Sequence, residues 1–291
     1  MKVLKKKATD NAVVGVVTAV LLIGLIVAVI SIVQTTYIPK IMEQREADHM
    51  DKVAEQFTYL TSIIDSQAVN AKNHKPLATA ITLGSKELPY MLSIRAFGTL
   101  EILDKEREIS IYNSSEFHFP FGVITYSSVN AYFLDQSYTY ETGAMIVSQS
   151  DGNKMMSPPF FFADYNETTN TVNITFDVVN ISSVGNKNIA SGFGTYPIQT
   201  EFHDKSTNKT FTDVNNITID TPFSLAWLAY IKNSLIEANL EYEGDDSQFL
   251  LTDMGQTLKL DFASSSNPPT TVNIIFKIIE IRAQIGPGWV E

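Results

Sequence analysis

The chain has 291 residues, of which 44% are hydrophobic, and its formal net charge at pH 7 is −11. Its length suits one large domain or two small ones, and its hydrophobic content excludes disorder throughout. The absence of cysteine excludes disulfides, thiol nucleophiles and cysteine-ligated metals, and the acidic charge is the opposite of what nucleic-acid binding needs, so we expect no nucleic-acid partner.

The first ten residues are basic, whereas the rest of the chain is acidic. Four lysines precede Asp10, which leaves 17 of the 21 basic residues and 31 of the 32 acidic residues to the remainder. Residues 12–33 carry no charge, and nearly all are Ala, Val, Ile or Leu. As a helix this run would be about 33 Å long, enough to cross a hydrocarbon core. We therefore expect a short basic leader at 1–10 and a single membrane-spanning helix at 11–36.

Two interpretations of this segment compete: a cleaved secretory signal peptide, or a helix that stays with the mature protein. The second is favoured because the run exceeds the roughly 7–15 apolar residues of a signal-peptide core and ends without a small-residue cleavage site. The lysines before the run and the acidic residues after it indicate a cytoplasmic N-terminus. Residues 37–291 are then expected outside the cell membrane.

The start of the chain also resembles a known family. Lys7-Ala8, followed by Asp10-Asn11-Ala12-Val13-Val14-Gly15-Val16-Val17, resembles the N-terminus of archaeal type IV pilins and archaellins. Those proteins have a basic leader, a processing site of Lys or Arg followed by Gly or Ala, and a long apolar helix. The resemblance implies that a prepilin peptidase cuts between Ala8 and Thr9, and that other pilin-like subunits are partners in surface filaments. The alternative is a plain single-pass anchor whose partner is membrane lipid.

Residues 37–67 are predicted to form an amphipathic stalk helix. Pro39 is expected to kink or restart this helix, and the polar run 43–48 is not expected to enter a core. After that run, apolar residues recur at spacings of three and four, which places them on one helical stripe. The stripe consists of Met50, Val53, Phe57, Leu60 and Ile64. Five positions are too few for a coiled coil, so we expect the stripe to pack on the following domain.

Residues 68–291 have the pattern of a β-rich domain. Short runs of β-branched and aromatic residues, separated by turn residues, predict strands. These runs are 77–83, 98–103, 108–112, 122–127, 144–148, 171–179, 210–214 and 271–281. The predicted fold is therefore α+β and membrane-anchored, a long N-terminal helix followed by a mainly antiparallel β-sandwich-like extracellular domain with one helix. Whether the strands form one sandwich or two is left open.

One helix interrupts this β-rich pattern at 224–239. Ser224 is its predicted N-cap. Its predicted buried face carries Leu225, Leu228, Ile231 and Leu235.

The most unusual local string is Ser157-Pro158-Pro159-Phe160-Phe161-Phe162. Large apolar side chains belong to the core more often than to a binding site. We therefore favour the interpretation that the phenylalanines are buried and enter a strand after the Pro-Pro turn. The alternative is an exposed platform for a ligand.

No catalytic or metal-binding motif stands out. The four histidines His49, His74, His118 and His203 are scattered, and no nucleophile elbow, phosphate loop or dinucleotide fingerprint is present. The acidic run of Glu241, Glu243, Asp245 and Asp246 lacks EF-hand spacing and is interpreted as a solvated loop. We therefore expect no catalytic residues, no cofactor and no metal.

Six Asn-X-Ser/Thr sequons are candidate glycosylation sites, and all follow the apolar run. They lie at Asn113, Asn166, Asn173, Asn180, Asn208 and Asn216. The sequence thus favours a non-enzymatic cell-surface glycoprotein of pilin-like type, displaying an acidic β-domain for adhesion or surface structure. The alternative is an anchored ligand-binding ectodomain, either a receptor or a solute-binding protein. An ectoenzyme is the least favoured class, because nucleophile and metal signatures are missing.

Overall fold

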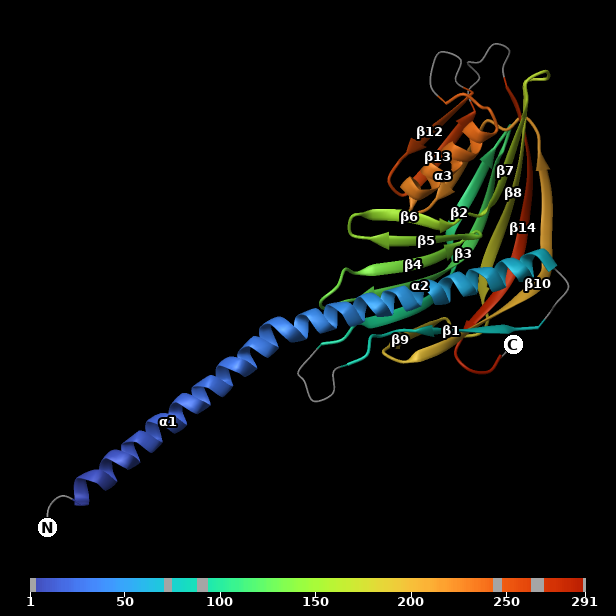
Figure 1. Cartoon of the computed structure of the whole chain (residues 1–291). Helices are drawn as coiled ribbons and strands as arrows, with labels where there is room; N and C mark the ends of the chain where they lie inside the picture. Colours follow the sequence, from blue (N-terminus) through green and yellow to red (C-terminus); the bar gives the residue numbers. More distant parts are fainter. Residues whose placement is uncertain (1–3, 71–74, 88–93, 243–247, 263–269, 290–291) are drawn as a thin grey trace.

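A computed structural model of the chain describes residues 4–70, 75–87, 94–242, 248–262 and 270–289. These residues form a long N-terminal helical arm and a β-rich head (Figure 1). The far part of the arm extends away from the head, and its near part lies against the sheets.

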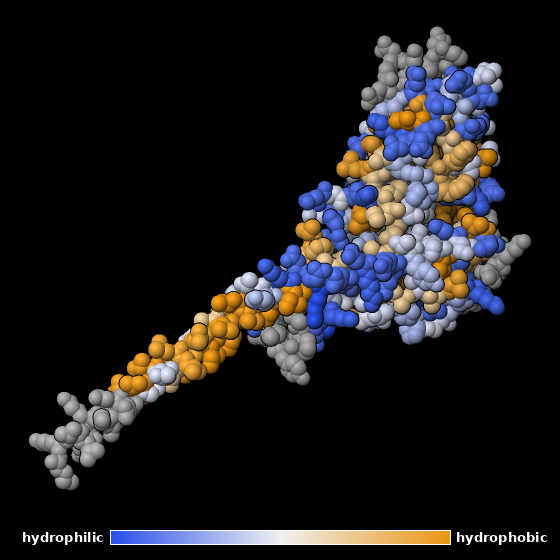
Figure 2. Space-filling model, in the orientation of Figure 1, coloured by the Kyte–Doolittle hydropathy of each residue, from blue (hydrophilic) through white to orange (hydrophobic). Residues whose placement is uncertain are grey.

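The arm is formed by α1 (Leu4–Ile32), a short π-helical segment (Val33–Tyr37) and α2 (Ile38–Asn70). Residues 13–32 of α1 are exposed on every side, which gives the arm the apolar surface seen in Figure 2. By length and composition this is the one helix among the described residues that could cross a membrane.

The predicted irregularity near Pro39 lies just before that residue. The helix continues through Pro39, and the widened turn precedes it, with the Ile38 N–H donating to the Val33 carbonyl. Proline has no N–H to offer to the carbonyl four residues back, so a wider turn is a low-cost way to continue the helix.

The head contains two sheets. The five-stranded sheet has the order β1-β10-β14-β8-β7. Its strands are β1 (Leu77–Thr82), β10 (Thr195–Phe211), β14 (Thr271–Ile285), β8 (Thr171–Ser183) and β7 (Phe160–Asn166). Every pairing in this sheet is antiparallel except that of β14 with β8, which is parallel.

The larger sheet has the order β12-β13-β11-β2-β3-β4-β5-β6, with β9 also paired to β2. Its strands are β12 (Phe249–Asp253), β13 (Thr257–Phe262), β11 (Asn216–Asp220), β2 (Phe97–Tyr112), β3 (Glu116–Val129), β4 (Gln136–Glu141), β5 (Ala144–Gln149), β6 (Gly152–Ser157) and β9 (Ile189–Gly192). All of its pairings are antiparallel. Together the two sheets partly enclose α2 (Figure 1), and the prediction of a mainly antiparallel β-rich head is confirmed.

Several strand predictions need correction. The runs 98–103 and 108–112 belong to one strand, β2, whose register with β3 shifts between Leu103 and Arg107. Lys105 has a φ of 51° in this bulge, which explains why the sequence pattern breaks there. The run 210–214 is wrong beyond Phe211, where β10 ends. The strands β4, β6, β9, β11, β12 and β13, and most of β10, match no predicted run, whereas β7 begins at Phe160, where the aromatic string was expected to enter a strand.

The head has two hydrophobic cores. One lies between the sheets under α3 (Ser224–Glu237) and includes Phe176, Phe276 and Trp227. The other surrounds α2 and contains all five residues of the predicted stripe. Each of these five is no more than 1% exposed, so the prediction that the stripe packs on the head is confirmed.

The two sheets come into close backbone contact where β3 passes β8. A Cβ added to Gly122 would lie 2.1 Å from the carbonyl oxygen of Ile181. The Gly122 N–H donates to the side-chain oxygen of Asn180 at 2.9 Å. Only glycine lets the two backbones meet in this way.

The helix α3 differs in detail from its prediction. Its N-cap is Phe223, and the Ser224 hydroxyl donates to the carbonyl of Gly255 instead of capping the helix. Leu225, predicted to be buried, is 56% exposed, whereas Trp227 is fully buried. Ile231 and Leu235 are buried as predicted, and Leu228 packs against the same core. The prediction is therefore wrong only in the first turn, where the large indole of Trp227 and not Leu225 occupies the core between the sheets.

Candidate functional site

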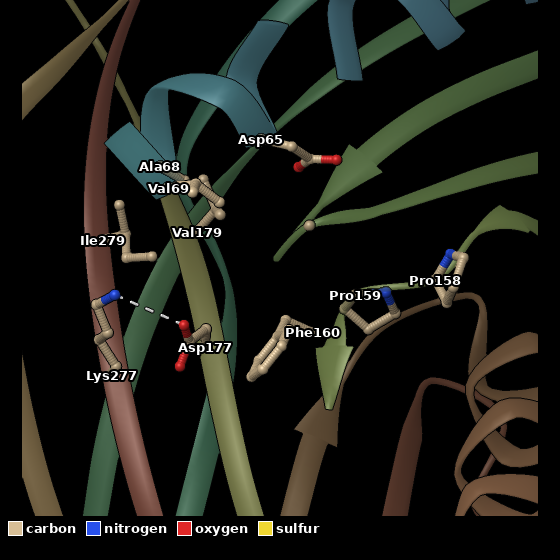
Figure 3. A pocket seen from close by; sticks show the side chains of 11 residues that line it. Asp65, Ala68, Val69, Pro158, Pro159, Phe160, Asp177, Val179, Lys277 and Ile279 are labelled. Atoms are coloured by element: carbon tan, nitrogen blue, oxygen red, sulfur yellow. Dashed lines mark ion pairs between the residues drawn. The ribbon is translucent and has the colours of Figure 1, made fainter. Parts of the chain in front are cut away.

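A groove of about 350 Å³ opens where α2 ends (Figure 3). The helix covers part of one face of the five-stranded sheet, and Val179 and Ile279 are buried there. Asp177 and Lys277 precede Val179 and Ile279 by two residues on the same strands, so their side chains lie on the same face of the sheet. This part of the face lies beyond the end of α2 and is not covered by the helix. The groove is lined by Asp65, Ala68, Val69, Gly143, Pro158, Pro159, Phe160, Asp177, Val179, Lys277 and Ile279.

Asp65 supplies the carboxyl group at the α2 side of this groove (Figure 3). Its Oδ1 accepts a long hydrogen bond of 3.5 Å from the hydroxyl of the fully buried Tyr140. Burial raises the pKa of Asp65 to about 6, although this hydrogen bond opposes the shift. Burial likewise raises the pKa of Tyr140 well above its usual value, so its hydroxyl remains a donor at neutral pH.

A second carboxylate faces the groove from β8. Asp177 pairs across the parallel strands with Lys277, at 3.6 Å from Oδ2 to Nζ. Burial raises the pKa of Asp177, and the charge of Lys277 opposes that shift. Lys277, the one lysine among the described residues that line the groove, is therefore engaged with a carboxylate of the same groove.

The string of three phenylalanines contributes both core and groove. Phe161 is 8% exposed and contacts Phe176, whereas Phe160 and Phe162 are each 59% exposed. The expectation of buried aromatics is thus wrong for two of the three rings. Side chains alternate along β7, and the face that carries Phe160 and Phe162 is the uncovered one.

The junction of arm and head contains a buried carboxylate that the sequence analysis missed. Glu46 lies in the polar run that was not expected to enter a core, yet it is fully buried. Its oxygens accept hydrogen bonds from the backbone N–H groups of residues 131–133, between β3 and β4. One turn further along α2, His49 Nε2 lies 3.0 Å from the Tyr126 hydroxyl, and burial lowers the pKa of His49. Both contacts hold α2 to the head at the end of the helix away from the groove.

The six sequons lie in different environments. Three asparagines are exposed: Asn166, Asn173 and Asn208. Asn113 and Asn216 are half-buried. Asn180 is also half-buried, and both ends of its amide are used, by the Gly122 N–H and by the Glu280 carboxylate.

The remaining candidate residues are dispersed. Lys7, Ala8 and Thr9 lie in α1. Of the acidic run, Glu241 follows α3, and Glu243, Asp245 and Asp246 lie outside the described residues, as does His74. In the part of the chain that the structure describes, no group of three or more His, Cys, Asp or Glu side chains is placed to hold a metal ion.

These features define a class of protein in which an exposed apolar helix continues into a β-rich head, and the head carries a groove with apolar walls and a few charged side chains. The chain belongs to the family of unknown function DUF7289, whose sequence pattern matches residues 11–260. No curated protein and no solved structure matched it.

Proposed function

We propose that this chain is a non-enzymatic cell-surface protein of archaeal type IV pilin-like kind. In this proposal α1 holds the protein in the cell membrane or in a filament core, with the N-terminus in the cytoplasm. The acidic head, glycosylated at exposed sequons, is presented outside for adhesion or surface structure.

One observation carries this proposal: an apolar helix exposed on all sides continues directly into a helix that is buried in the head. Residues 13–32 are exposed, whereas residues such as Phe57 and Ile64 further along the same arm are fully buried. Because exposed apolar surface of this extent is unfavourable in water, α1 needs lipid or other apolar helices around it. The buried half of the arm fixes the head to whatever holds α1.

The experiment is to determine the intact mass and the N-terminal sequence of the membrane-extracted protein, with and without a co-expressed prepilin peptidase. We expect a new N-terminus at Thr9, or a few residues later before Val13, in the presence of the peptidase. Lys7→Ala should prevent the cut, and Lys5→Ala, in the same basic leader, should not. An uncut chain under both conditions would leave a plain single-pass anchor.

A second candidate function is ligand capture by an anchored ectodomain. The groove at the end of α2 favours it, because about 350 Å³ falls within the usual size range of small-molecule sites. Its mixture of apolar walls and a few polar groups is also typical of such sites.

A further inference from the structure

The polar groups of the groove have an uncompensated negative charge. Lys277 is paired with Asp177. Among the described residues, no basic side chain forms an ion pair with Asp65 on the opposite side. With both carboxyls ionised, the lining set of two carboxylates and one lysine has a net charge of one negative unit.

The rest of the groove wall is apolar. Val69 is 83% exposed on one side, and Phe160 is 59% exposed on the other. Pro158 and Pro159 extend the wall next to Phe160 (Figure 3). A ring face such as that of Phe160 attracts cations as well as apolar groups.

We propose that this groove binds a small organic cation, an ammonium group on an apolar body, with the ammonium at Asp65 and the body against Phe160. The chemistry is complementary at both ends. Asp65 accepts a charge-assisted hydrogen bond from the ammonium, and the apolar body removes Val69, Pro159 and Phe160 from water. A neutral analogue lacks the first interaction, and an anion is repelled by both carboxylates.

This inference rests on ligand capture, the second candidate function, and it does not depend on processing of the leader. The pKa of Asp65 near 6 adds a condition. As the pH falls through that value, Asp65 becomes neutral and the cation loses its partner. Binding should therefore weaken on acidification.

The test uses the full chain in lipid nanodiscs and isothermal titration calorimetry, with empty nanodiscs subtracted. The probes are 2-phenylethylamine, its neutral counterpart 2-phenylethanol, and the anion 3-phenylpropionate. We expect the amine to bind at least about tenfold more tightly than the alcohol at about pH 7, and to bind more weakly at about pH 5. The anion should not bind.

Three variants locate the interaction. Asp65→Asn should reduce amine affinity to that of the alcohol and remove its pH dependence. Asp164→Asn, an exposed carboxylate on β7 outside the groove lining, should leave the affinity unchanged. Phe160→Ala should weaken the amine and the alcohol alike. Circular dichroism of each variant checks that the head remains folded.

The results separate two kinds of failure. If the alcohol binds as tightly as the amine and Phe160→Ala weakens both, the groove captures ligands but does not select cations, and the inference falls alone. If none of the probes binds above the empty-nanodisc signal, both the inference of cation binding and the proposal that the groove captures a ligand are overturned. If Asp164→Asn is as damaging as Asp65→Asn, the amine is attracted only by the general acidity of the head, which also overturns the inference.

Discussion

The carboxylate of Glu46, on α2, accepts a hydrogen bond of 2.7 Å from the backbone N–H of Tyr132, in the loop between β3 and β4. The neighbouring N–H groups of Ala131 and Phe133 donate to the same carboxylate at 3.1 and 2.8 Å. A single buried side chain thus accepts hydrogen bonds from three backbone N–H groups of a loop that is not part of either sheet. This contact fastens the arm to the head close to the point where the arm leaves it.

Glu46→Ala should destabilise the head by about 2–4 kcal/mol, because three part-buried backbone N–H groups lose their acceptor and a fully buried side chain is removed. Urea denaturation in detergent, followed by tryptophan fluorescence, measures the change in the free energy of unfolding. Glu43→Ala is the matched control, since Glu43 is exposed on the same helix, and it should have little effect. Equal losses in the two variants would show that the contact with the loop is not stabilising.

Phe57→Ala should cost about 3–5 kcal/mol, the usual range for removal of a buried aromatic ring. Phe57 is fully buried and contacts the rings of Tyr126 and Tyr138, with centroids 6.3 and 5.9 Å apart. Tyr59→Ala provides the comparison, because Tyr59 is 60% exposed. The same denaturation assay applies, and a loss for Tyr59→Ala as large as that for Phe57→Ala would contradict the packing of this stripe.

Asp65→Asn should stabilise the head at about pH 7 and have no effect below about pH 4. Burial raises the folded-state pKa of Asp65 to about 6, above its unfolded value, so the folded state binds the proton more tightly. The parent therefore loses stability as pH rises between these two pKa values. Because solvent at the groove mouth screens the charge, we expect only about 1 kcal/mol. The measurement is the denaturation midpoint of the parent and of Asp65→Asn across this pH range. If the difference between the two midpoints does not narrow on acidification, the raised pKa of Asp65 is contradicted.

Trp227→Phe should destabilise the head by about 2–4 kcal/mol, because the buried carboxyl group of Glu141 loses a hydrogen-bond donor. The indole N–H donates to Oε1 of Glu141 at 2.5 Å, and the Thr221 hydroxyl donates to the same oxygen at 2.8 Å. Glu141 is fully buried, and burial raises its pKa although these donors oppose the shift. In Trp289→Phe the effect should be small, because that indole N–H has no hydrogen-bond partner among the described residues. Thermal unfolding followed by circular dichroism distinguishes the two variants.

Glycosylation should be restricted to exposed sequons. In a host that modifies these sites, glycopeptide mass spectrometry should find sugar at Asn166, Asn173 or Asn208 and none at Asn180. The Asn180 side-chain nitrogen donates to both oxygens of Glu280 at 2.9 Å, so it is not available for transfer in the folded head. A glycan at Asn180 would contradict this assignment.

The sequence predicted best those elements whose signal is local. The stripe from Met50 to Ile64 could be read from its spacing, because positions three and four apart share a helix face whatever surrounds them. The strand β8 was also predicted from a local pattern, because apolar and polar residues alternate along it as expected of a strand with one buried face. The bulge in β2 made one strand resemble two. The five-residue strands β11 and β12 were missed, although runs of the same length at 108–112 and 144–148 were predicted.

By itself the sequence determined that a long apolar helix precedes an amphipathic one and a β-rich region, because composition and periodicity are properties of neighbouring residues. Only the tertiary structure decided that Glu46 is buried, that Phe160 is exposed, and that Asp65 lies across a groove from Asp177. Glu46 is buried because the loop between β3 and β4 packs on it, whereas the placement of Phe160 and Asp65 depends on where α2 stops covering the five-stranded sheet. Each is a relation between segments far apart in the chain. No local pattern encodes that relation, because burial is set by what packs against a residue and not by its sequence neighbours.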